Sequence, residues 1–165
     1  MIFSSLEFLC VFFPAVFLLH CALPSIALKN AWLVAASLLF YAYGEPVYVL
    51  LMVGSAMVNY IAARGIAALP YKNCILWADI AVNLGILGWF KYAGFLADAA
   101  GILFGFRLHV PELALPIGIS FFTFQEISYV VDVYRGKAEA QENFGKLLLY
   151  ISFFPQLIAG PVVKY

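Results

Sequence analysis

Long stretches without charged residues constrain this chain more than any other feature. Asp, Glu, Lys and Arg are absent from residues 8–28, 30–44, 46–63 and 147–163. Two further apolar stretches, 73–90 and 113–133, contain only one and two acidic residues. A membrane-spanning helix needs about 20 mostly apolar residues, whereas a transmembrane barrel alternates apolar and polar residues. The pattern therefore predicts an all-α fold, a polytopic bundle of transmembrane helices.

The composition excludes an ordinary water-soluble domain. The 165 residues are 65% apolar and 11% charged, whereas soluble domains are about 45–50% apolar and about 25% charged. Nine basic residues balance nine acidic ones, and the sequence contains no basic run. We therefore expect a lipid bilayer around the chain and no nucleic acid among its partners.

The first apolar stretch has the length of a secretory signal but not its flanks. A signal peptide has a positive N-terminal region and a small-residue cleavage site, yet the first seven residues contain Glu7 and no Lys or Arg. A lipoprotein signal at Cys21 is disfavoured because the bulky, polar His20 precedes it. We expect a retained N-terminal helix, and we interpret Cys10, Cys21 and Cys74 as small buried apolar residues.

Proline and glycine positions divide the chain into predicted helices. The expected ranges are 8–28, 30–43, 46–63, 74–91, a shorter segment at 93–106, 113–134 and 145–163. Polar linkers are expected at 107–112 and 135–143. Pro14 and Pro24 predict bends in the first helix, and Pro155 predicts a kink in the last one, because proline removes a main-chain donor.

Several of these helices are shorter than a bilayer requires. The range 30–43 ends at the turn Gly44-Glu45-Pro46, where Pro46 keeps Glu45 out of helical geometry and can begin the next helix. Interrupted main chain at membrane depth must face protein or a cavity. We therefore expect short, kinked helices, with either a locally thinned bilayer or re-entrant segments packed against protein.

Basic residues between the helices predict the orientation of the chain. Lys29 follows the first predicted helix, and Arg64 and Lys72 follow the third. The turn between the second and third helices contains Glu45 and no basic residue. The positive-inside rule places the basic loops in the cytoplasm, so the N-terminus is expected on the extracytoplasmic side.

One predicted helix concentrates polar residues on a single face. At 100° per residue, an arc of about 100° holds Gln125, Ser128, Tyr129 and Asp132, and Glu126 lies about 60° beyond it. Ionisable groups at membrane depth cost about 2.5–3.5 kcal/mol or more, so they usually point into a bundle or a wet cavity. Two interpretations stay open: the lining of a cavity or tunnel, and a polar cluster that pins helices together.

Other polar candidates give weaker signals. Asp132 and Arg135 can also emerge together at the membrane surface and pair there. Gln156 can face a substrate or satisfy main chain freed by the preceding proline. His20 and His109 have no Cys, His or acidic residue nearby at metal-ligand spacing, so we interpret both as packed or solvated. The sequence contains no GxSxG, HExxH, P-loop or dinucleotide motif.

Several motifs, taken together, are similar to a known family over essentially the whole chain. They are Phe3–Leu9 (FSSLEFL), Ser37–Pro46 (SLLFYAYGEP), Asn59-Tyr60, Asn83–Tyr92 (NLGILGWFKY), Leu115–Gly136 and Phe153–Pro161 (FFPQLIAGP). The chain resembles the membrane-bound O-acyltransferase family, and within it the alginate O-acetyltransferase branch that modifies bacterial exopolysaccharides. The motifs at 115–136 and 153–161 carry the specific part of this resemblance.

The resemblance implies a multi-pass enzyme of the bacterial inner membrane that passes an acetyl group to a polysaccharide outside the cytoplasm. It implies a cytoplasmic acetyl donor such as acetyl-CoA, no bound cofactor, and periplasmic acetylation partners. Family members carry a catalytic histidine in their later half. Residues 1–165 are therefore interpreted as the N-terminal part of a single domain, truncated before that histidine and inactive alone.

The resemblance also gives the polar residues a role in the enzyme. The predicted substrate-lining residues are Gln125, Glu126, Tyr129, Asp132, Arg135 and Gln156. No residue of the chain is assigned to catalysis or to metal binding. Two alternatives stay open: transfer of an acyl or D-alanyl group to a cell-wall polymer, and a small transporter or helper membrane protein.

Overall fold

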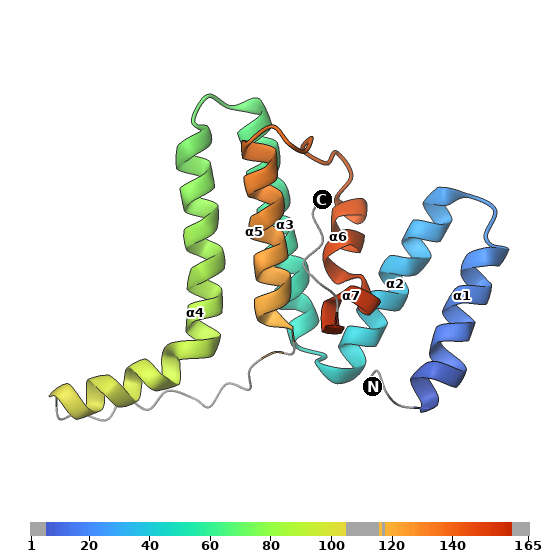
Figure 1. Cartoon of the computed structure of the whole chain (residues 1–165), viewed down its shortest axis with the longest axis horizontal. Helices are drawn as coiled ribbons and strands as arrows, with labels where there is room; N and C mark the ends of the chain where they lie inside the picture. Colours follow the sequence, from blue (N-terminus) through green and yellow to red (C-terminus); the bar gives the residue numbers. More distant parts are fainter. Residues whose placement is uncertain (1–5, 105–115, 117, 160–165) are drawn as a thin grey trace.

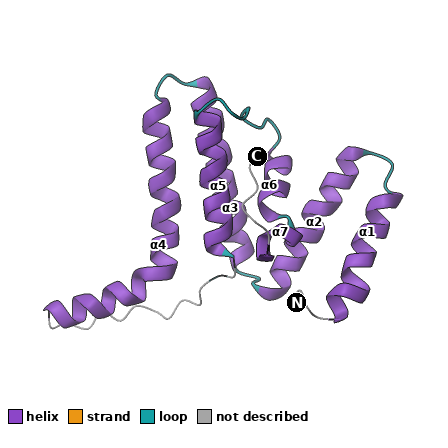
Figure 2. Ribbon diagram, viewed as in Figure 1, coloured by secondary structure: helices purple, strands orange, loops and turns teal. Residues whose placement is uncertain are grey.

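The computed structural model describes residues 6–104, 116 and 118–159. This part of the chain is helical with short connecting loops, and it contains no strand (Figure 2). The segments are η1 (Phe8–Phe12, a π-helix), α1 (Phe13–Ala22), α2 (Ile26–Gly44), α3 (Tyr48–Ala68), α4 (Lys72–Phe104), α5 (Ile119–Tyr134), α6 (Phe144–Ser152) and α7 (Phe154–Ala159). The predicted all-α fold is confirmed.

Three of the described helices are long and apolar enough to cross a membrane. They are α2, α3 and the first part of α4, Lys72–Tyr92. The helices α5 and α6 have 16 and 9 residues, which is less than a full crossing needs. The prediction of a helical bundle with short members therefore holds.

The prediction of one helix over residues 8–28 is wrong at its C-terminal end. Helix α1 ends at Ala22, and Leu23 is extended (φ −73°, ψ 132°) because Pro24 disfavours helical geometry in the preceding residue. The Ser25 side chain then accepts a hydrogen bond from the Leu28 amide at 3.2 Å and caps α2. Pro24 thus separates two helices instead of bending one.

Two more predicted helix boundaries differ from the observed ones. Helix α2 begins before the predicted range 30–43, so it reaches 19 residues and Lys29 lies in its first turn. Helix α3 begins two residues after Pro46 and continues to Ala68, so Arg64 lies within the helix. The intervening turn at Glu45 and Pro46 occurs where the sequence predicts it.

The predicted segments 74–91 and 93–106 form one continuous helix as far as the structure describes them. Helix α4 runs for 33 residues from Lys72 to Phe104, longer than one crossing requires. Beyond the spanning part its axis turns sideways, away from the bundle (Figure 1). The polar linker predicted at 107–112 lies outside the described residues.

The predicted kink in 145–163 is a full break between two helices. Phe153 leaves helical geometry (φ −55°, ψ 109°) between α6 and α7. Pro155 has no amide to offer the carbonyl of Ile151, and the Gln156 amide instead bonds the Phe153 carbonyl at 3.0 Å. The last residues of the predicted range, 160–163, lie outside the described residues.

The helices pack around α3. Helices α3, α4 and α5 contact one another in pairs, α6 contacts both α3 and α2, and α1 packs against α2. The loops α1–α2, α3–α4 and α5–α6 lie at one end of the bundle, which we call the loop end, and the α2–α3 turn lies at the other (Figure 1). Residues far apart in the sequence therefore meet at the same depth.

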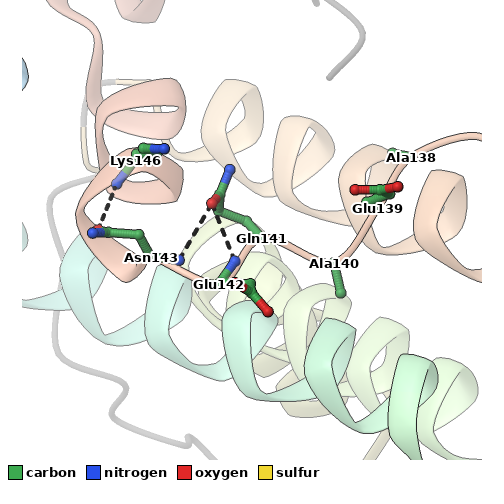
Figure 3. Close-up of a pocket in the computed structure, with 7 residues that line it drawn as sticks. All are labelled: Ala138, Glu139, Ala140, Gln141, Glu142, Asn143 and Lys146. Atoms are coloured by element: carbon green, nitrogen blue, oxygen red, sulfur yellow. Dashed lines mark hydrogen bonds between the residues drawn. The ribbon is translucent and has the colours of Figure 1, made fainter. Parts of the chain in front are cut away.

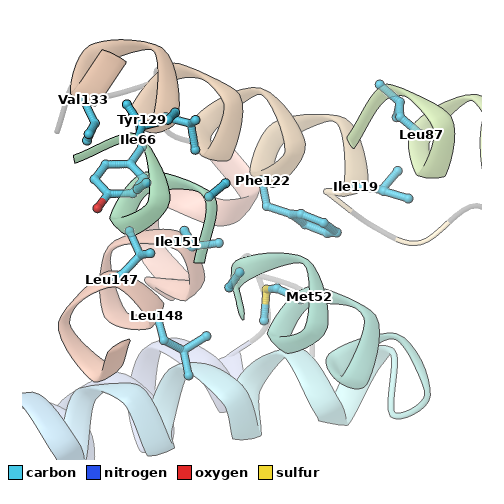
Figure 4. Close-up of a cluster of buried hydrophobic side chains, with 14 of the residues drawn as sticks. Met52, Ile66, Leu87, Ile119, Phe122, Tyr129, Val133, Leu147, Leu148 and Ile151 are labelled. Atoms are coloured by element: carbon cyan, nitrogen blue, oxygen red, sulfur yellow. The ribbon is translucent and has the colours of Figure 1, made fainter. Parts of the chain in front are cut away.

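Apolar side chains fill the space between these helices. The core cluster includes Met52, Ile66, Phe122, Leu147 and Ile151, each 0–1% exposed (Figure 4). A second cluster joins η1 to α2 and α7 through stacked and edge-on phenylalanine rings. Its members are Phe8, Phe12, Phe40 and Phe154, with ring centroids 5.3–5.9 Å apart.

Candidate functional site

The helix α5 carries the predicted polar face, and glycine sets both of its ends. Gly118 adopts a left-handed conformation (φ 76°) immediately before Ile119, where a side chain would be strained. Gly136 (φ 69°) ends the helix after Arg135. The predicted range 113–134 is therefore wrong at its start, because Pro116 and Gly118 are not helical and α5 begins at Ile119. Residues 113–115 and 117 lie outside the described part.

Glu126 of α5 is fully buried against α3. Asn59 Nδ2 donates a hydrogen bond to Glu126 Oε2 at 3.2 Å, and Ser55 Oγ lies 2.9 Å from Glu126 Oε1. The Ser55 hydroxyl is also 3.0 Å from the Met52 carbonyl, and its single hydrogen can serve only one of these acceptors. The carboxyl group thus joins α5 to α3 without contact with solvent.

The bond network extends from α3 to α4. Asn59 Nδ2 lies 3.1 Å from Asn83 Oδ1, and Asn83 Nδ2 donates back to Asn59 Oδ1 at 3.1 Å. Asn59 Nδ2 is also 2.9 Å from the Ser55 carbonyl, so its two hydrogens can serve only two of its three acceptors at a time. The two side chains are 0% and 2% exposed. Three helices therefore share one buried polar network, which we call the core network: Ser55, Asn59, Asn83 and Glu126.

The other buried polar residues of α5 point to different neighbours. Gln125 Nε2 donates to the Tyr150 carbonyl of α6 at 2.8 Å. Tyr129 Oη accepts from the Gln141 amide at 2.9 Å, in the loop after α5. The structure does not bring the polar face together at one point, because adjacent helices approach it from several directions.

Three of the predicted lining residues are less enclosed. Asp132 is half-buried and Arg135 is exposed, and the main-chain carbonyl of Asp132 accepts from the Lys137 amide at 2.9 Å. Gln156 lies half-buried on α7, and its Nε2 has no hydrogen-bond partner among the described residues. The pairing of Asp132 with Arg135 is not formed, since the one ion pair in the described part joins Arg64 to Glu142 at 3.5 Å.

These contacts hold helices and a loop together. A substrate-lining role for Gln125, Glu126, Tyr129, Asp132, Arg135 and Gln156 stays a prediction, because no ligand contact tests it.

The break between α6 and α7 places further polar groups next to α2. There the Phe154 amide donates to Ser37 Oγ at 3.4 Å, and the buried Ser152 hydroxyl has no partner among the described residues.

The loop between α5 and α6 lines an open hollow of about 800 Å³ at the loop end of the bundle. Gln141 Oε1 accepts from the amides of Glu142 and Asn143 at 3.1 and 3.3 Å (Figure 3). Tyr60 Oη donates to the Glu142 carbonyl at 2.7 Å and fixes this loop on α3. The hollow thus has an ordered polar wall that begins directly after the polar face of α5.

Sequence reasoning missed the partners of Glu126. Ser55, Asn59 and Asn83 received no site role, and Asp79 was noted only as an interruption of an apolar stretch, although all four are at least 95% buried. The signal was available, because Ser55 and Asn59, and likewise Asp79 and Asn83, are four residues apart on one helix face. The helical spacing that marks the polar face of α5 thus also marks these two pairs.

The cysteine and histidine predictions have different outcomes. The interpretation of Cys10, Cys21 and Cys74 as buried is wrong, since all three are exposed in the structure. Apolar sequence surroundings do not imply burial within the protein when helices face lipid. His20 is half-buried, His109 lies outside the described residues, and the described part contains no cluster of residues suited to a metal ion.

The comparison with known proteins accounts for the motifs. The whole chain is 38% identical to the probable alginate O-acetylase AlgI of Pseudomonas putida and covers 36% of that protein. It is also 38% identical to the Pseudomonas aeruginosa AlgI, covering 33% of it, and 34% identical to the peptidoglycan O-acetyltransferase of Helicobacter pylori, covering 37%. No family model matches the chain, and no solved structure gives a significant match.

The relatives that the chain matches over its whole length are membrane-bound O-acyltransferases. The chain spans about a third of the length of these curated relatives. As in the sequence-based prediction, the chain is a membrane protein, with three described helices able to span a bilayer.

We expect the Tyr129 hydroxyl to hold the α5–α6 loop in place. Tyr129→Phe removes the acceptor for the Gln141 amide, which costs about 1 kcal/mol and raises local opening about fivefold. Trypsin cleavage after Lys137, followed by mass spectrometry in detergent, measures this opening. Tyr134→Phe is the control, because its hydroxyl bonds Asn73 at an exposed site. Equal cleavage of both variants would contradict the role given to Tyr129.

Proposed function

We propose that this chain is part of a membrane-bound O-acetyltransferase that places acetyl groups on a polysaccharide outside the cytoplasm. The observation that carries the proposal is the 34–38% identity, over the whole chain, to relatives named for alginate and peptidoglycan O-acetylation. The two named acceptors are both carbohydrate polymers, and both names specify an acetyl group on oxygen. The shared chemistry is therefore ester formation at a sugar hydroxyl.

The reaction needs an activated acetyl donor and a base. In the proposed step the sugar oxygen bonds the acetyl carbon, the bond from that carbon to its donor breaks, and the hydroxyl proton passes to the base. For a thioester donor such as acetyl-CoA the leaving group is the thiol. By family resemblance the base is a histidine in sequence that this chain does not include, and no described residue is assigned that role.

The described residues would supply the scaffold and part of the reaction path. The core network fixes α3, α4 and α5 against one another. Asp132 and Arg135 lie at the end of α5, before the loop residues 138–143 that line the hollow, and Gln156 follows the break between α6 and α7. Interrupted helices at membrane depth line cavities in other membrane proteins, which supports a path between these two places.

The acceptor has two candidates because the relatives divide in the same way. An exopolysaccharide similar to alginate is the first, supported by the Pseudomonas relatives. Peptidoglycan is the second, supported by the Helicobacter pylori relative. D-alanyl transfer and a small transporter receive no support from these comparisons. Periplasmic proteins that complete the acetylation belong to the proposal for either acceptor.

The distribution of charge supports a cytoplasmic position for the loop end of the bundle. The described basic residues at or near that end are Lys29, Arg64, Lys72, Arg135, Lys137 and Lys146. The opposite end has Lys91 together with Glu7 and Glu45. By the positive-inside rule the N-terminal end of η1 then lies on the extracytoplasmic side. The membrane in this proposal is the bacterial inner membrane.

Deletion of the gene tests the proposed function. We expect most acetate released by mild alkali to disappear from the exopolysaccharide, and the gene expressed at its native length to restore it. NMR of the purified exopolysaccharide and of peptidoglycan from the same cells distinguishes the two acceptors. Unchanged acetyl content in both polymers would exclude the proposed reaction.

The same complementation assay examines the lining residues. Asp132→Ala should lower acetylation at normal protein level, whereas Lys72→Ala, at the exposed start of α4 and outside the lining of the hollow, should not. Restoration by Asp132→Ala equal to that by the unmodified gene would remove Asp132 from the reaction path.

The orientation predicts which introduced cysteines a membrane-impermeant maleimide can reach. With the three native cysteines replaced by serine, Glu45→Cys should react in intact spheroplasts and Lys137→Cys only in inverted vesicles. Lys137 in the α5–α6 loop is exposed and Glu45 in the α2–α3 turn is half-buried. The two connections lie at opposite ends of the bundle (Figure 1), so each position is the control for the other. The reverse pattern would invert the topology.

A further inference from the structure

Asp79 is a buried acid without a partner in the described structure. Its side chain is 3% exposed, and neither carboxylate oxygen accepts a hydrogen bond from a described residue. It lies in the spanning part of α4, seven residues after Lys72, or about 10 Å along the helix. A buried acceptor left unpaired costs about 1–3 kcal/mol, and more when charged.

The neighbouring donors are already used. Both amide hydrogens of Asn83 have acceptors, namely Asn59 Oδ1 at 3.1 Å and the main-chain carbonyl of Asp79 at 2.9 Å. The buried side chains of the described part include Glu126 but no Lys, Arg or His. The core network therefore contains one acid, two amides and the Ser55 hydroxyl, whose donors already face other acceptors, and it has no free donor for Asp79.

Asp79 also lines an apolar groove between α3 and α4. The groove has a volume of about 320 Å³ and is lined by Val58, Ile61, Ala62, Cys74, Ile75, Ala78, Asp79 and Val82. Ile61 and Val82 are 63% and 45% exposed. Asp79 is the single acid in this lining, and every other lining side chain is apolar.

We propose that the α3–α4 groove seats a transmembrane helix that presents a hydrogen-bond donor to Asp79. The source is the remaining sequence of the protein, because this chain covers only about a third of the relatives it matches. The apolar wall suits an apolar helix, and the unpaired carboxylate selects a face with Lys, Arg, His, an amide or a hydroxyl. The inference concerns assembly of the bundle, so it stands independently of the acceptor proposed above.

Photo-crosslinking in the protein at its native length tests this contact. A benzophenone amino acid replaces Ile61 or Val82, one on each wall of the groove. Trp77 is the control, since it lies near Asp79 on α4, is 69% exposed, and does not line the groove. We expect Ile61 and Val82 to crosslink within one polypeptide to the same apolar peptide beyond these 165 residues, within about one turn of a donor side chain, and Trp77 not to do so.

The contribution of the Asp79 side chain to the contact is tested separately from that of the groove. Asp79→Leu should lower the crosslinking yield from Ile61 about threefold, the effect of one average interhelical hydrogen bond, and Asp79→Asn should lower it less because an acceptor oxygen remains. If Asp79→Leu does not fold, the decrease with Asp79→Asn relative to the unmodified protein decides. Crosslinks only to lipid, to residues 1–165, to a second copy or to another protein would overturn the proposal, and so would a yield independent of residue 79.

Discussion

The hydrogen bonds between Glu126, Asn59 and Asn83 are the interaction on which the bundle depends. In a bilayer no water can satisfy these side chains, so each must find a partner on another helix. Asn59 occupies the centre, because it bonds α5 through Glu126 and α4 through Asn83. These bonds fix the rotation of three helices about their axes. Apolar packing alone specifies rotation poorly when lipid is as apolar as the core.

The rest of the structure follows from this arrangement. With α3, α4 and α5 held against one another, another side of α3 receives α6, and α6 in turn contacts α2. Helix α6 is too short to cross the bilayer, and α6 and the described part of α7 pack against α2, where Ser37 accepts a hydrogen bond from Phe154. The phenylalanine cluster around Phe40 then attaches the N-terminal helices. Polar contacts thus lie near the centre and apolar surface outside, as a membrane protein requires.

Much of the fold could be predicted from uncharged stretches and proline positions. Helix class and the turn at Glu45 and Pro46 follow from local chemistry. The break at Pro24 was predicted only as a bend, because a proline pattern does not show whether a serine such as Ser25 will cap a new helix. The length of α4 was also not predicted. Residues 93–106 were expected as a separate segment, because an apolar composition does not show whether a stretch continues the preceding helix or forms a new one.

The candidate site was predicted only in part, for a physical reason. Periodicity correctly placed Gln125, Glu126 and Tyr129 on buried faces of α5, but it cannot show which helix approaches each face. The partners of Glu126 come from sequence 67 and 71 residues away. Asn59 was noted as part of a motif and Asp79 as an interruption. Their common burial depends on helix pairing that a single sequence does not specify.

A double-mutant cycle between Asn59 and Glu126 tests the central claim most directly. The free energies of unfolding of Asn59→Ala, Glu126→Ala and the double variant are measured in detergent micelles, with the exposed pair Arg64 and Glu142 as a parallel cycle. The account predicts a coupling energy of about 1 kcal/mol for the buried pair and a value near zero for the exposed pair. Additive effects at Asn59 and Glu126, within about 0.3–0.5 kcal/mol, would contradict it.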